Sequence, residues 1–121
     1  QKYRKKISQR VIMPYHHTLS ASGGWHKLSL IEQMANIGSE VSRAQEWKGR
    51  NEKYFGNAIT RAFELFDLTI QDARWRGRLK ELTRAREIFA DAVLGGKEYN
   101  TTLKDLERYF FCFAFAARIR T

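Results

Sequence analysis

The sequence contains very little proline and cysteine and has no long hydrophobic run. Its one proline, Pro14, lies near the beginning, so no later segment is barred from a long helix by proline. Its one cysteine, Cys112, excludes a disulfide framework within the chain and predicts a buried, unreactive thiol in an intracellular, cytoplasmic protein. The longest apolar stretch, residues 110–117, is too short to cross a bilayer, so we expect no membrane partner.

Residue sets that would indicate catalysis or metal binding are also missing. There is no Cys-x-x-Cys pair, no phosphate-binding glycine loop, no Glu-x-x-His spacing, and no Ser–His–Asp set on elements expected to be rigid. Glu64 and Asp67 share one helix face, and we interpret them as a salt-bridged edge facing Arg61 rather than as a metal site. We therefore expect no enzyme, no cofactor and no metal ion.

The chain is basic and of single-domain size. Its 121 residues include 22 lysines and arginines against 13 aspartates and glutamates, which gives a formal net charge of +9. A hydrophobic content of 43% is sufficient for one core. The charge predicts a polyanionic partner but does not indicate a fold.

The first 24 residues differ in composition from the rest. They contain no acidic residue. They include the only proline of the chain and end in a Gly23–Gly24 pair, which is typical of a flexible joint. We interpret residues 1–24 as a basic N-terminal arm or linker and residues 25–121 as the folded domain. The arm carries five basic side chains, namely Lys2, Arg4, Lys5, Lys6 and Arg10.

Four segments after the arm have apolar residues at helical spacing, and no segment alternates long enough to form a sheet. These segments predict an all-α domain, an antiparallel up-down-up-down four-helix bundle. Gly38 lies in the middle of the first helix, where we expect close approach of a neighbouring helix. The first helix opens at Ser29 and stops near 48–49, the second covers about 51–71, the third starts between 73 and 78 and ends at 95–96, and the fourth starts at 101 or 102.

The second and fourth helices are apolar over a wider arc than one bundle usually covers. Phe111 and Phe115 point away from the stripe centred on Phe110, and the second helix carries two adjacent stripes. We predict a subunit interface or partner groove there, formed by Phe63, Phe66, Phe111 and Phe115. The alternative is that the arm covers the phenylalanines of the fourth helix.

Residues 74–86, "RWRGRLKELTRAR", hold six basic residues and one acid. A plain solvated face is one interpretation. However, cations in the first turn of a helix are unfavourable, and the exposed N–H groups there suit a phosphate. Trp75 could stack on a base or cap the core, and we favour the cap. Arg86 points away from the strip formed by its neighbours, towards Glu40 or Glu64.

The predicted topology gathers these cations at one end of the bundle. The arm, the turn between the second and third helices, and the end of the fourth helix share that end, whereas cations at the opposite end are interleaved with acids. We therefore predict weakly sequence-specific contacts to the phosphate backbone of RNA or DNA. Besides the five cations of the arm, the predicted contacts are Arg74, Arg76, Arg78, Lys80, Arg84, Arg118 and Arg120.

The folded part of the chain resembles a known family. The segments "WHKLSLIEQMANIGSEVSRA", "ELFDLTI" and "GRLKELTRAREIFAD" are similar to the four-helix-bundle family of the 23S rRNA intervening-sequence protein type. That family includes the accessory variability determinant (Avd) of diversity-generating retroelements. The resemblance implies a homopentamer with a basic surface that binds a reverse transcriptase and its template RNA without being an enzyme. It leaves out the arm, which is either an added RNA clamp or a segment introduced for expression.

Two hypotheses of function follow. The first is a nucleic-acid-binding accessory subunit of a retroelement reverse transcriptase. The second is a homo-oligomeric helical scaffold or protein-interaction module whose charge serves solubility or a protein partner. Salt-dependent binding to structured RNA distinguishes them.

Overall fold

The computed structural model describes residues 24–120 and, within them, every side chain except that of Arg120. Almost all of the predicted arm lies outside this part of the chain. The described part is all-α and contains no strand, as predicted. Its elements are the 3-10 helix η2 (Gly24–Lys27), α3 (Leu30–Trp47), α4 (Glu52–Ile70), the 3-10 helix η3 (Ala73–Arg78), α5 (Leu79–Val93) and α6 (Leu103–Arg120).

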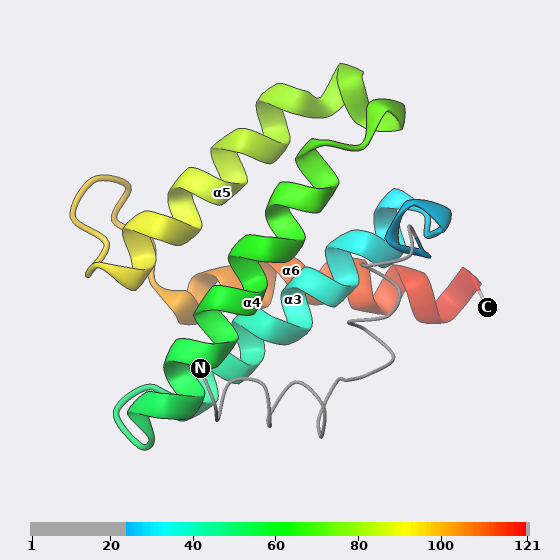
Figure 1. Cartoon of the computed structure of the whole chain (residues 1–121). Coiled ribbons are helices and arrows are strands. Elements are labelled where there is room, and N and C mark those ends of the chain that lie inside the picture. The colour runs from blue at the N-terminus through cyan, green and yellow to red at the C-terminus, as the bar shows by residue number, and fades with distance from the viewer. Residues whose placement is uncertain (1–23, 121) are drawn as a thin grey trace.

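The four α-helices pack against each other, and each runs opposite to the one before it (Figure 1). The helix α3 is central, because it packs extensively against both α4 and α6. The helix α5 lies beside α4 and makes only few contacts with α6. The four-helix prediction is therefore confirmed, with α6 displaced towards α3.

The helix ends are determined locally, at the residues that the sequence predicted. The Ser29 hydroxyl accepts from the Glu32 N–H at 3.1 Å, and the Glu32 carboxylate accepts from the Ser29 N–H at 2.9 Å. Thr102 and Asp105 form the same reciprocal pair before α6, at 3.0 and 3.1 Å. Each pair satisfies N–H groups that a helix start otherwise leaves without partners. After α5 the backbone turns at Gly95, whose φ of 116° suits glycine.

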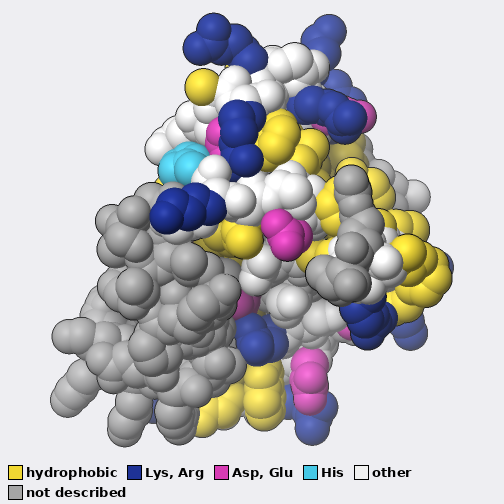
Figure 2. Space-filling view, turned by 90° about the vertical axis from the view of Figure 1, so that its right-hand side faces the viewer, with side chains coloured by type: hydrophobic (Ala, Val, Ile, Leu, Met, Phe, Trp, Pro, Cys, Tyr) yellow, Lys and Arg dark blue, Asp and Glu magenta, His cyan; other side chains and the backbone are white. Residues whose placement is uncertain are grey.

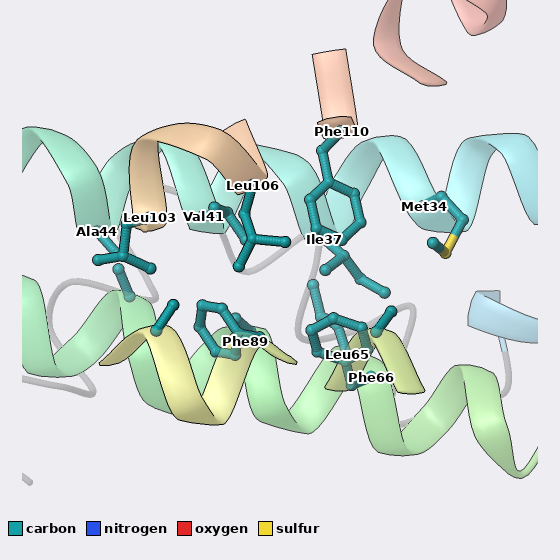
Figure 3. Packing of buried hydrophobic residues seen from close by; sticks show 14 of the residues in the cluster. Met34, Ile37, Val41, Ala44, Leu65, Phe66, Phe89, Leu103, Leu106 and Phe110 are labelled. Atoms are coloured by element: carbon teal, nitrogen blue, oxygen red, sulfur yellow. The ribbon is translucent and has the colours of Figure 1, made fainter. Parts of the chain in front are cut away.

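The core lies between α3, α4, α5 and the inner side of α6. Figure 3 shows Phe110 pointing from α6 towards Ile37 of α3 and the Leu65–Phe66 pair of α4. The Phe66 ring lies 5.7 Å from Phe89 and 6.1 Å from Phe110 between centroids. Each fully buried side chain of this size stabilises the fold by about 1.5–3 kcal/mol. The largest fully buried apolar side chains are Trp25, Phe66, Phe89, Phe110, Ile37 and Leu65.

Gly38 allows α3 and α6 to approach each other closely. A Cβ atom placed on Gly38 would lie 2.6 Å from the Cβ atom of Phe110, which is closer than real side chains pack. The predicted role of this glycine is therefore confirmed, and Phe110 is the residue that occupies the space.

The outer face of α6 is apolar and exposed. Phe111 and Phe115 have exposed fractions of 59% and 53%, and Ile119 of 66%. These phenylalanines lie outside the core, as predicted. Cys112 is exposed as well, so the prediction of a buried thiol is wrong. The reason is that Cys112 follows Phe110 by two residues, roughly 200° around the helix at about 100° per residue.

The second apolar stripe of α4 packs within the chain and does not form the predicted subunit interface. Phe66 was assigned to a subunit interface, but it is fully buried in the chain's own core and has no surface to offer a partner. Phe63 is half-buried, and its ring packs edge-on against Phe89 at 5.0 Å with the Arg86 guanidinium 4.8 Å from its centroid. The physical reason is that α5 lies along α4 and covers this stripe from within the same chain.

None of the helices in the described part of the chain combines the length and the hydrophobicity needed to cross a bilayer.

Candidate nucleic-acid interface

The start of α3, the η3 segment and the later part of α6 meet at one end of the molecule. Leu30 and Trp75 line the same hollow there as Phe113. The topology therefore brings the turn between the second and third helices together with the fourth helix, as predicted, whereas residues 1–23 of the predicted arm lie outside the described part of the chain. Figure 2 looks onto this side and shows lysine and arginine side chains gathered in its upper part, with hydrophobic ones between them. We call the exposed cations of η3 and the first turn of α5 the basic pole; they are Arg74, Arg76, Arg78 and Lys80.

Arg74 is bonded to other residues of its own chain, whereas we predicted from the sequence that its side chain contacts phosphate. Its Nε and Nη2 atoms donate to the two carboxylate oxygens of Asp72, at 3.0 and 2.7 Å. Nη2 also donates to the Leu28 carbonyl at 2.7 Å, and the guanidinium stacks 4.4 Å from the centroid of the Trp75 ring. This bidentate pair fixes the guanidinium plane and neutralises its charge. Arg74 consequently holds η3 against the start of α3.

Asp72 is the centre of a buried polar network at this end. Besides Arg74, its carboxylate accepts from His26 Nδ1 and from Gln33 Nε2, each at 3.1 Å. The Arg74 guanidinium, helped by these donors, holds the pKa of the Asp72 carboxyl well below its usual range against the opposing effect of burial. The Gln33 carbonyl oxygen in turn accepts from the Trp75 indole N–H at 2.9 Å. The network thus fixes η3, and with it the basic pole, onto α3.

Trp75 caps the core, which is the favoured of the two roles considered from the sequence. The side chain is half-buried and packs against the core cluster, and its indole N–H is bonded to Gln33. Its ring carries the Arg74 guanidinium on one face.

Arg76 and Lys80 are the cations of the pole that remain available. Both side chains are exposed, and neither has an acidic partner among the described residues. Arg78 contacts Glu81 at 3.5 Å, with side chains 61% and 72% exposed. Such exposed pairs contribute at most about 1 kcal/mol, so a phosphate can replace the carboxylate.

The other predicted contacts divide into two groups. Arg84 is exposed on α5 and contacts Glu87 at 3.9 Å, and Arg118 is exposed in the last turn of α6. The remaining contacts lie outside the described side chains, namely Lys2, Arg4, Lys5, Lys6, Arg10 and Arg120.

Arg86 binds a different acid from the two that were predicted. Its Nε atom donates to Asp67 at 2.8 Å, because α5 lies beside the C-terminal half of α4. Glu64 instead pairs with Arg61 at 2.8 Å, which confirms the predicted salt-bridged edge. Glu40 is buried and pairs within its own helix. Arg86 therefore belongs to the contact between α4 and α5 and not to the pole.

Sequence reasoning missed the network around Asp72, although two signals for it were present. Asp72 directly precedes η3 and accepts from the Arg74 N–H at 3.1 Å, a position where aspartate is favoured. Gln33 is a polar residue on the apolar stripe of α3, and it is fully buried. A polar residue at such a position needs hydrogen-bond partners, and here they come from η2 and η3.

In comparisons with known proteins, the chain matches no family model, no curated protein and no solved structure. The family resemblance thus stays a prediction from the sequence. Its coarser part, a four-helix all-α domain, is what the structure shows. Within residues 24–120, no three His, Cys, Asp or Glu side chains are grouped as a metal site would require.

The Asp72 network predicts a loss of stability in acid. Because the pKa of Asp72 is lowered on folding from its ordinary value of 3.8, the unfolded state takes up a proton more readily. The stabilisation is complete above that ordinary value and is lost as the pH falls towards the folded pKa. We expect the free energy of unfolding, measured with urea, to fall by about 1 kcal/mol between roughly pH 6 and pH 3 through this group.

An Asp72→Asn variant isolates this contribution from that of the other carboxylates. It is expected to be less stable than the unmodified chain at neutral pH and to lose less stability on acidification. Equal acid sensitivity of the two proteins would show that Asp72 is not the group responsible.

Proposed function

We propose that this chain is a non-enzymatic accessory subunit that binds the phosphate backbone of RNA or DNA through its basic pole. In this proposal it associates with a reverse transcriptase and its template RNA in a diversity-generating retroelement. The observation that carries nucleic-acid binding is the exposed pair Arg76 and Lys80, which have no acidic partner among the described residues. The reverse-transcriptase partnership is supported by the resemblance of the sequence.

The position of these cations supports a phosphate as the ligand. Arg76 lies in the last turn of η3, and Lys80 lies in the first turn of α5, where the partial positive charge of a helix start makes a cation unfavourable by a few tenths of a kcal/mol. Arg78, at the N-cap of α5, makes no side-chain capping bond. An incoming phosphate relieves the repulsion between the cations and offers acceptors to the start of the helix. A solvated face without a ligand would leave the repulsion between these cations uncompensated.

Salt dependence of RNA binding tests the proposal. Each phosphate contact to a single strand contributes about −0.7 to the slope of log K against log salt. Three or four contacts would therefore weaken binding by roughly 20- to 50-fold between about 50 and 200 mM salt. Fluorescence anisotropy of a labelled single-stranded RNA measures this. An affinity independent of salt, or no binding at the lower salt concentration, would contradict the proposal.

The outer face of α6 favours a second candidate, a homo-oligomer, for which the sequence resemblance implies a pentamer. Phe111 and Phe115 are exposed, and their rings are stacked with centroids 6.5 Å apart. Together with Ile119 they form an apolar strip typical of a contact between subunits. This assembly is compatible with the first function, because the strip and the basic pole are made by different residues.

Replacing Phe111 and Phe115 together by serine is expected to lower the mass of the assembly. The free energy of unfolding of the single chain should change little, because both side chains lie outside its core. Light scattering after size-exclusion chromatography measures the mass. The control is Leu94→Ser, at a residue 81% exposed in the turn after α5. An unchanged mass in the double variant, or the same decrease in the control, would argue against this interface.

A further inference from the structure

A hollow of about 580 Å³ lies at the basic pole, between the start of α3, the η3 segment and α6. This volume lies within the range of small-molecule sites, roughly 300–1,000 Å³. Its apolar wall includes Leu30 of α3, Trp75 of η3 and Phe113 of α6, and its positive charge comes from Arg78, because the neighbouring Arg74 is already paired with Asp72. None of the described residues that line it is acidic. The hollow is therefore suited to a ligand that combines a flat apolar part with negative charge.

Arg74 and Trp75 give this hollow an ordered pair of a guanidinium over an indole ring. The guanidinium is fixed by the bidentate bond to Asp72 and by the Leu28 carbonyl, and it lies 4.4 Å from the centre of the indole ring. The indole is itself held by its bond to Gln33. Both an aromatic ring and a guanidinium plane are surfaces on which nucleobases stack. Because the pair is already ordered, a base would stack on it without the entropic cost of ordering these side chains.

The rim of the hollow has open space beside Gly77 and an exposed positive charge on Arg78. Gly77 forms part of the wall, and a Cβ atom placed on it would meet nothing within 4 Å. The Arg78 side chain is 61% exposed, and its one ion pair among the described residues is the long contact with Glu81. It can therefore turn to a phosphate attached to a ligand in the hollow. Arg76 and Lys80 flank this position in the sequence and offer sites for the adjoining phosphates.

We propose that the hollow binds one unpaired nucleobase of a single-stranded nucleic acid. The base stacks on the platform formed by Arg74 and Trp75, and Arg78 holds its phosphate. The inference rests on the proposed function and adds to it, because contacts to phosphates alone would not distinguish a strand with bases from one without. A paired base is excluded, since it is enclosed by its neighbours in the duplex.

The test compares two strands of equal charge. One is an oligodeoxythymidylate of about 12 nucleotides, a length within the usual site size, and the other has the same backbone without bases. Stacking of one base is expected to make the first strand bind on the order of tenfold more tightly. A Gly77→Leu variant places a bulky apolar side chain at the wall of the hollow while every cation is retained. It should lose this preference and keep the salt-dependent affinity for the strand without bases.

The matched control is Gly56→Leu on α4, where an added Cβ atom also meets nothing within 4 Å. It should keep the preference. Gly77→Met, with a more flexible side chain, serves as a second blocking variant if the leucine perturbs the circular dichroism spectrum. Its expected result is the same.

The outcomes separate this inference from the proposed function. If both strands bind equally and in a salt-dependent manner, the nucleobase site is overturned and the proposed function remains. A preference that survives in both Gly77 variants also overturns the inference, because the base then lies elsewhere. If neither strand nor RNA binds, the proposed function fails and the inference with it.

Discussion

Replacing Arg76 and Lys80 together by glutamate is expected to weaken RNA binding on the order of 100-fold at constant salt. Each substitution removes a phosphate contact and places a carboxylate where the backbone would lie. The slope of log K against log salt should become shallower by the contribution of about two phosphate contacts. Both side chains are exposed and lack acidic partners among the described residues, so the thermal unfolding transition should remain close to that of the unmodified chain.

A variant with the same total charge tells a local effect from a general one. Lys48 follows α3 and Lys97 lies between α5 and α6, and both are exposed at the end opposite the basic pole. Each lysine-to-glutamate change lowers the net charge by two, so the control pair and the test pair both reduce it from +9 to +5. The control should retain most of the affinity. If both double variants lose affinity equally, net charge and not the basic pole determines binding.

Gly38→Leu is expected to cause the largest loss of stability of any single substitution considered. A Cβ atom alone would lie 2.6 Å from the Cβ atom of Phe110, and the longer side chain would push α6 away from α3. Overpacking of this kind destabilises by about 3 kcal/mol or more, which is a large part of a small domain's stability. Urea denaturation followed by circular dichroism measures the change.

Gly56→Ala provides the comparison within the same bundle. Gly56 lies inside α4, and its added Cβ atom would meet no neighbouring atom within 4 Å. Helix propensity alone then acts, so this variant should be more stable by about 0.5–1 kcal/mol. A Gly38→Leu variant as stable as the unmodified chain would contradict the close packing of α3 against α6.

The helices could be predicted from the sequence because their signals are local. The capping pair Ser29 and Glu32 lies within one helical turn, and so does the pair Thr102 and Asp105. Glycine at position 38 indicated a close neighbour without identifying Phe110. Periodicity gives the direction of a side chain around its own helix, and this was enough to place Phe111 and Phe115 outside the core.

Predictions that depended on which helices are neighbours were less successful. Phe66 is buried because α5 and α6 bring Phe89 and Phe110 to it, and the second stripe of α4 does not reveal this. The partner of Arg86 is Asp67, which depends on how α5 is positioned along α4. At the pole, a count of charges does not show that Asp72 has already neutralised Arg74. Tertiary contacts decide these points, and one sequence carries little information about them.

The indole N–H resonances in a nuclear magnetic resonance titration with single-stranded RNA give the most direct test of the basic pole. The chain has three tryptophans. Trp75 lies between Arg74 and Arg76 of the basic pole, whereas Trp47 ends α3 at the opposite end and packs edge-on against Tyr54. Binding at the pole predicts that the Trp75 resonance moves as RNA is added while that of Trp47 stays in place. Movement of Trp47 with Trp75 unchanged, or equal movement of both, would contradict the assignment.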